Sequence, residues 1–223
     1  MSLPWLGMGT DNEDRLLLTE AAVSMGAVAI WATHYIGERA VVMASGADHH
    51  QLLHRISLTV ASVFLSVVIA GASFYTFSFA KGFRWPQNVL GGLLIGSAVS
   101  GTYYLDQYGI INYSYVNSEK HVVGAVLVAV VASTAAFSFS SYITLVLTNT
   151  WSKRLACTLL LAASVSGMQW VAAAGTKYEY KRTLKIVGLS HLEIVIVVAC
   201  VVRLVRGIKY QASLTLDRVL FAA

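Results

Sequence analysis

Long apolar runs constrain the fold of this chain more than any other feature of its sequence. Of its 223 residues, 57% are hydrophobic and only 12% are charged, whereas a soluble domain carries about 25% charged residues. The apolar residues gather in runs of about 18 residues or more, which is enough to cross a hydrocarbon core of roughly 30 Å. The sequence therefore predicts an all-α fold, a polytopic transmembrane helix bundle, without a separate soluble domain.

We expect about six membrane spans, over residues 16–42, 56–80, 88–110, 122–147, 155–175 and 186–204. The transmembrane domain then extends over residues 16–206, between an N-terminal segment at 1–15 and a short tail at 207–223. The N-terminal segment carries Asp11, Glu13 and Asp14. It therefore lacks the basic region and short apolar stretch of a cleavable signal peptide.

Three of the predicted spans end in related phrases, which read ATHYIG at 32–37, GTYYLD at 101–106 and GMQWVA at 167–172. Thr102 lies 69 residues after Thr33, and Met168 lies 66 residues after Thr102. The spans between them also resemble each other, with ASFYTF at 72–77 and AAFSFS at 135–140. A period of this length on membrane helices predicts a repeated two-helix unit. It places three polar and aromatic clusters at one depth, as a site at one membrane face requires.

Basic residues between the spans indicate the orientation of the chain in the membrane. The side that holds the N-terminus carries nine Lys and Arg residues, and the opposite side carries seven. Because basic loops favour the cytoplasm, we expect both termini to be cytoplasmic and the three phrases to lie at the outer face of the plasma membrane. These loop positions also account for the net charge of +5, so we expect no nucleic-acid partner.

The three phrases are similar to the signature of the MHYT domain family. Their longer forms read IWATHYIGERA at 30–40, GTYYLDQ at 101–107 and SGMQW at 166–170, and they look most like the fungal branch. The resemblance covers residues 25–180 and implies an integral membrane sensory or signalling domain. It also implies a copper site near the outer ends of alternate helices, which senses oxygen, carbon monoxide or nitric oxide. Members of the family usually have seven helices, and the leading one is missing from the expected spans here.

The residues at the motif positions depart from the family pattern. The Met and His positions of the three repeats hold Thr33 and His34, Thr102 and Tyr103, and Met168 and Gln169. The candidate metal ligands are therefore His34 and Met168, because imidazole and thioether groups suit copper. Tyr103, Asp106 and Glu38 are the candidate helpers. An alternative interpretation makes His34 a neutral imidazole that is hydrogen-bonded to Tyr103, Gln169 or a backbone carbonyl.

Other residues near the phrases carry weaker expectations. The aromatic positions are kept as Tyr35, Tyr104 and Trp170, which predicts that an aromatic frame of the site persists. Glu38 and its neighbour Arg39 are expected to reach the outer interface and water. A further group of histidines follows, at positions 49, 50 and 54, and we expect a solvated loop for that segment. The alternative is a helix, on which His50 and His54 would share one face and could hold a divalent metal.

These patterns predict a non-enzymatic, MHYT-like membrane sensor or signalling protein, which senses copper or a diatomic gas if the altered site still binds metal. The expected partners are the lipid bilayer, a cytoplasmic signalling protein and, in a homo-oligomer, a second copy of the chain. The sequence shows no nucleophile–base pair, phosphate-binding loop or pair of catalytic carboxylates, so no enzyme is predicted. Two alternatives stay open, namely a transporter or channel for small solutes or ions and a structural membrane subunit without a ligand.

Overall fold

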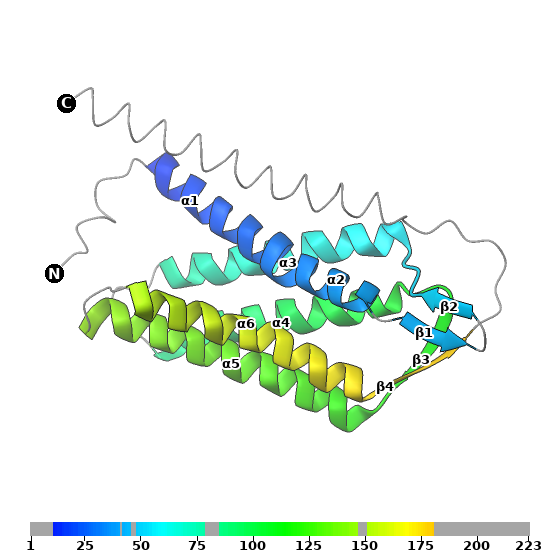
Figure 1. Ribbon diagram of the computed structural model, residues 1–223. Helices are drawn as coiled ribbons and strands as arrows, with labels where there is room; N and C mark the ends of the chain where they lie inside the picture. Colours follow the sequence, from blue (N-terminus) through cyan, green and yellow to red (C-terminus); the bar gives the residue numbers. More distant parts are fainter. Residues whose placement is uncertain (1–10, 41, 46–47, 79–84, 147–150, 181–223) are drawn as a thin grey trace.

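A computed structural model of the chain describes residues 11–40, 42–45, 48–78, 85–146 and 151–180 (Figure 1). Within these ranges the helices lie side by side in one elongated bundle. They are α1 (Asp11–Val23), η1 (Ser24–Ala32), α2 (Thr33–Ala40), α3 (Ile56–Ser78), α4 (Trp85–Tyr108), α5 (Glu119–Val146) and α6 (Trp151–Ala174). The first three follow one another without a break and form a single long helix.

The predicted bundle of membrane-length helices is confirmed. Four helical stretches are long and apolar enough to cross a membrane: Arg15–Glu38, Ile56–Thr76, Glu119–Tyr142 and Leu155–Ala174. They correspond to the first, second, fourth and fifth predicted spans. The predicted span at 186–204 and the predicted tail at 207–223 lie outside the described residues, so the expected number of spans is confirmed only in part.

The third predicted span, α4, is a full-length helix but is less apolar than the other four. It packs against α3, α5, η1 and α6. Its buried residues include Asn88, Ser100, Thr102, Asp106 and Gln107. Polar side chains are tolerated in a membrane bundle where they face other helices instead of lipid. The composition of α4 therefore follows from its central position.

Small residues let the neighbouring helices approach closely. A Cβ atom added to Gly96 of α4 would lie 2.7 Å from the Cα of Val130 in α5, and one added to Gly26 of η1 would lie 2.5 Å from the Cα of Val67 in α3. Separations this short leave no room for a side chain. Without a hydrophobic force between helices in lipid, such close backbone packing is a main source of their association.

Short strands, which the sequence did not predict, lie together at one end of the bundle (Figure 1). After α2, β1 (Val42–Ser45) and β2 (Asp48–Gln51) form an antiparallel hairpin. β3 (Tyr113–Asn117) follows α4 and β4 (Thr176–Tyr180) follows α6, and these two pair antiparallel with Tyr113 opposite Tyr180. We call this end, formed by the four strands and the last turns of α2, α4 and α6, the motif end. All three motif helices finish there, as the repeat predicts.

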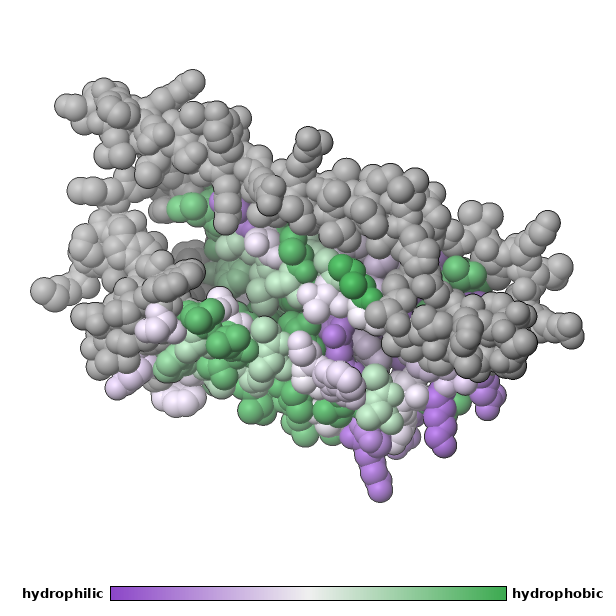
Figure 2. Space-filling model, in the orientation of Figure 1, coloured by the Kyte–Doolittle hydropathy of each residue, from purple (hydrophilic) through white to green (hydrophobic). Residues whose placement is uncertain are grey.

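Exposed apolar side chains follow the outer faces of the helices. On α3, Val60, Phe64 and Val68 are exposed at intervals of one helical turn, and on α5 so are Leu127 and Val131. Figure 2 shows apolar side chains along the middle of the visible face and hydrophilic ones toward the motif end. An apolar girdle with polar ends fits a bundle that is surrounded by lipid.

Candidate functional site

Equivalent positions of the three repeats meet at the motif end. His34 of α2, Tyr103 of α4 and Gln169 of α6 occupy the His position of their repeats. The Gln169 Nε2 atom lies 2.6 Å from His34 Nδ1 and 3.4 Å from the Thr33 carbonyl oxygen. The rings of His34 and Tyr103 meet edge to face, with centroids 5.8 Å apart. We call these three residues the motif cluster, and it shows that the repeat in the sequence is also a repeat in space.

The contact with Gln169 determines which ring nitrogen of His34 accepts a hydrogen bond and which carries the proton. With the amide nitrogen donating, His34 Nδ1 is the acceptor, and the ring proton of the neutral imidazole sits on Nε2. His34 is fully buried. Its Nε2 lies near the backbone of Val99 but makes no hydrogen bond of ordinary geometry to a described residue. This is the hydrogen-bonded arrangement that the sequence offered as the alternative to a metal ligand.

The Met positions of the repeats do not converge in the same way. Met168 is fully buried in the apolar core, in one cluster with Ile30, Val99 and Tyr103. Thr102 is buried as well, whereas Thr33 is exposed. The thioether of Met168 therefore has the surroundings of a core side chain.

A second polar contact lies one helical turn after His34. Glu38 is four residues further along α2 and so shares the inward face of His34. Its Oε2 atom lies 2.9 Å from His54 Nε2, and both residues are buried. The His54 ring also packs against Tyr35, with centroids 5.5 Å apart. The expectation that Glu38 reaches water is therefore wrong, because the residue that shares a helix face with a buried His34 must itself point inward.

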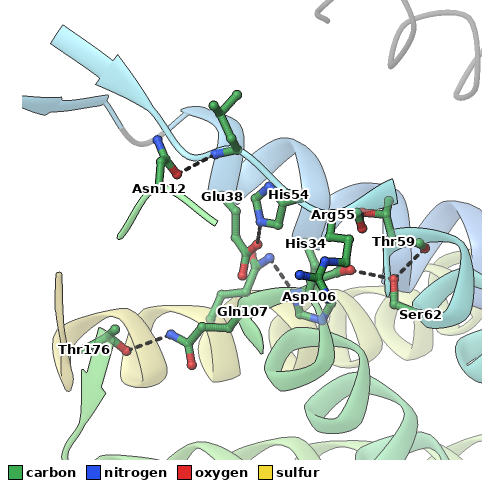
Figure 3. Close-up of polar contacts among 12 residues, drawn as sticks. His34, Glu38, His54, Arg55, Thr59, Ser62, Asp106, Gln107, Asn112 and Thr176 are labelled. Atoms are coloured by element: carbon green, nitrogen blue, oxygen red, sulfur yellow. Dashed lines mark hydrogen bonds and ion pairs between the residues drawn. The ribbon is translucent and has the colours of Figure 1, made fainter. Parts of the chain in front are cut away.

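Asp106 of α4 completes this polar group. It accepts a hydrogen bond from the Ser62 hydroxyl of α3 at 2.6 Å. Both Asp106 and Tyr103 lie within electrostatic range of Glu38. Figure 3 shows Glu38, His34 and Asp106 in one group between His54 and Ser62. Of the three helper residues inferred from the sequence, Tyr103 contacts the His34 ring, while Glu38 pairs with His54 and Asp106 with Ser62.

Gln107, the next residue of α4, connects the helices to the strands. Its side-chain oxygen accepts from Asn117 Nδ2 at 2.6 Å, and its nitrogen donates to the hydroxyls of Thr176 and Tyr178 at 3.3 and 3.4 Å. Thr176 also donates to the side-chain oxygen of Asn117 at 2.9 Å. Burial raises the pKa of the Tyr178 phenol, so this group stays neutral and able to hydrogen-bond. We call these four residues the strand network.

Comparison with known proteins agrees with this arrangement. Residues 28–91 match the family model named MHYT, which is described as the N terminal repeat of bacterial signalling proteins. This segment is therefore similar to an MHYT repeat. It runs from η1 through the first phrase and α3 into the start of α4, so it contains one two-helix unit. No curated protein and no solved structure matches the chain.

The match to the MHYT model confirms the resemblance inferred from the sequence. Together with the apolar helices it fits an integral membrane protein of the sensory and signalling class. MHYT is a signalling repeat and not a known enzyme family. The repeat also contains His34, Glu38, His54 and Ser62, so most of the polar group belongs to the matched segment.

The MHYT positions of this chain do not fit a copper site. Copper sites use several soft or imidazole ligands that converge on one point. Here Tyr103 and Gln169 stand in two of the His positions. Gln169 is hydrogen-bonded to Nδ1 of the remaining imidazole, so this nitrogen is not available to a metal. In the part of the chain that the structure describes, no group of three His, Cys, Asp or Glu residues is arranged to hold a metal ion.

The aromatic positions of the MHYT phrases do not form a frame. Tyr35 is buried, Tyr104 is half-buried, and Trp170 is 78% exposed. The prediction that the frame persists is therefore wrong. The three helices are rotated differently about their axes, so only the His positions point toward one another.

The burial of His54 against Glu38 is the feature of this site that sequence reasoning missed. The expectation of a solvated loop is wrong for His54, which is buried, and the alternative of a helix face shared with His50 is wrong too, because His50 lies in strand β2 and His54 bridges to Ile110 in extended backbone. Its burial has one signal in the sequence: two leucines precede it, and an apolar span begins two residues later. A histidine in such surroundings needs a polar partner, but the sequence does not indicate Glu38, because Asp48 is the nearer acid before it in the chain.

Proposed function

We propose that this protein is a membrane sensor of the MHYT type whose motif end responds through contacts among its own side chains, without a bound metal. The contact between Gln169 and His34 carries this proposal. The third repeat supplies an amide that binds the one imidazole left in the cluster. A hydrogen bond of this kind joins the first and third motif helices directly.

The continuous helix from α1 to α2 supports a signalling role. It connects the motif cluster at one end of the bundle with the opposite end. A displacement of His34 or Glu38 can therefore be carried along one element, as in other helix-based switches. We propose that the motif end faces outward from the plasma membrane, that both termini are cytoplasmic, and that a cytoplasmic partner receives the signal.

Elemental analysis of the purified protein, after exposure to copper and removal of excess metal, tests the metal-free part of this proposal. The matched control is the His34→Ala/Met168→Ala double variant. We expect no stoichiometric copper in either protein. Stoichiometric copper that is lost in the double variant would overturn the proposal and favour copper sensing at His34 and Met168.

A flux measurement in proteoliposomes tests the proposal against transport. We expect the protein to pass neither small ions nor small polar solutes above the rate of empty liposomes. A flux that saturates with solute concentration would show a transporter instead of a sensor. The Glu38→Ala variant is the control, because a transport pathway through the polar group would be altered by it.

A further inference from the structure

The helix that carries the first motif changes its geometry just before the motif. Residues Ser24–Ala32 form a π-helix, η1, between the α-helical segments α1 and α2. A π-helix has i→i+5 hydrogen bonds, is rare beyond a single turn, and occurs often at functional sites. Because η1 ends at the residue before Thr33, the direction in which His34 and Glu38 point depends on its hydrogen-bond register.

Packing against α3 holds the N-terminal half of η1 in place. Gly26 lies against the backbone of Val67 in α3, so close that no side chain would fit between them. Further along η1, Ile30 and Trp31 are buried. The Trp31 ring stacks on Tyr35 of α2, with centroids 5.2 Å apart and planes 16° apart. The segment before the motif is therefore anchored to α3 at Gly26, and its end packs on α2 through Trp31.

Polar contacts fix α2 beyond the π-helix. They are the contact of His34 with Gln169 and the contact of Glu38 with His54. Each joins α2 to a different part of the molecule, α6 in the first case and the segment ahead of α3 in the second. Ile36 and Gly37, which lie between these contacts, are exposed. The orientation of α2 thus depends on a small number of side chains.

A change from π to α geometry would rotate α2 relative to its anchor. An α-helix turns about 100° and rises about 1.5 Å per residue, and a π segment holds roughly one residue more than the α-helix that would replace it. With Gly26 fixed on α3, this difference must appear in α2. A rotation of that size would take His34 away from Gln169 and Glu38 away from His54 together.

We propose that η1 is a register switch: its π form holds the motif cluster and the Glu38–His54 pair together, and its α form releases both. This inference rests on the proposed function, since it describes how the motif end communicates with the rest of the long helix. The stimulus would act by favouring one register over the other. It would need no contact with η1 itself, because the two polar contacts of α2 stabilise the π register and their loss would favour the α register.

Deletion of one residue from η1 tests the switch. Ala29 is exposed, so its removal takes nothing from the core. It leaves a segment that can be α-helical while α1 and α2 both keep their contacts. We expect the ΔAla29 protein to fold in nanodiscs with a melting temperature near that of the intact chain. The matched control deletes Ala61, which is exposed on the regular helix α3. It should lower the melting temperature strongly, because every later residue of α3 then loses its partners.

Amide hydrogen exchange over residues 24–40 supplies the second measurement. Replacing the contact residues (Glu38→Gln with Gln169→Ala) should speed exchange across the whole segment at least tenfold in the intact chain. In the ΔAla29 background the same replacements should change exchange less than threefold, because no second register is left.

Two results would overturn the inference: equal acceleration in both backgrounds, or a ΔAla29 protein as unstable as ΔAla61. Neither result depends on metal or on a stimulus. The two tests are therefore independent. A failed switch would not contradict the metal-free sensor, and copper found by elemental analysis would not change the interpretation of the exchange result.

Discussion

The ends of α2 and α6 occupy equivalent places in the repeat but have opposite surroundings. At the end of α2, His34, Tyr35 and Glu38 are all buried, whereas at the end of α6 Gln169 is half-buried and Trp170 is 78% exposed. The cause is position in the bundle. α2 contacts both the central helix α4 and α6, while α6 packs mainly on α5. An internal repeat thus preserves one shared contact point, whereas the helices that neighbour each copy determine which of its other side chains are buried.

Removing the carboxyl group at the α2 end should have the largest effect on stability. Glu38→Ala leaves His54 buried without its partner, and breaking a buried pair in this way costs about 3–5 kcal/mol. Thermal unfolding in nanodiscs should show the loss. The Glu38→Leu/His54→Leu double variant should be more stable than Glu38→Ala, because no uncompensated polar group is left. Equal losses in both proteins would mean that packing, and not the pair, holds this end of α2.

At the α6 end, substitutions of two adjacent residues should differ in their cost to stability. Gln169→Ala leaves His34 Nδ1 buried without a donor, which costs about 1–3 kcal/mol. Trp170→Ala removes an exposed side chain, and changes of that kind stay within about 0.5 kcal/mol. Unfolding midpoints measured in parallel would test the contrast. A larger loss for Trp170→Ala would show that this face of α6 is covered in the membrane, for example by a second copy of the chain.

A substitution in the strand network should have the smallest effect on stability. Thr176→Val keeps the shape of the side chain but removes its hydrogen bonds to Asn117 and Gln107, at a cost of about 1 kcal/mol. Faster hydrogen exchange in β3 and β4, with the helices unchanged, would show it. Lys177→Ala, at the next and exposed position, is the control. If exchange in α6 also rose, the strands would be holding that helix in place.

The sequence predicted the helices and the meeting of the repeats because both follow from patterns of simple physical origin. Apolar runs mark lipid-facing helices. A fixed spacing places Thr33, Thr102 and Met168 at one depth, and the neighbouring His34, Tyr103 and Gln169 then share an end of the bundle. The orientation in the membrane, the span at 186–204, the oligomeric state and the partner stay predictions.

The features that could not be predicted depend on contacts between distant segments. Strands β3 and β4 are two short polar and aromatic stretches, and each becomes a strand only beside the other. No residue pattern distinguishes the π-helix at 24–32 from an ordinary apolar helix. The burial of Glu38 and His54 was missed because charged residues at the end of a span usually reach water, and only their pairing makes burial favourable.

The pairing of β3 with β4 also sets an order for assembly. The β1–β2 hairpin joins neighbouring stretches of chain and can form as soon as residue 51 has been made. Strand β3 must wait for β4, which comes only after α5 and α6 have been synthesised. A ribosome-bound chain that stops before residue 176 would hold Gln107 without Thr176 and Tyr178. The strand pairing at the motif end is therefore completed only when the last described element of the domain has been made.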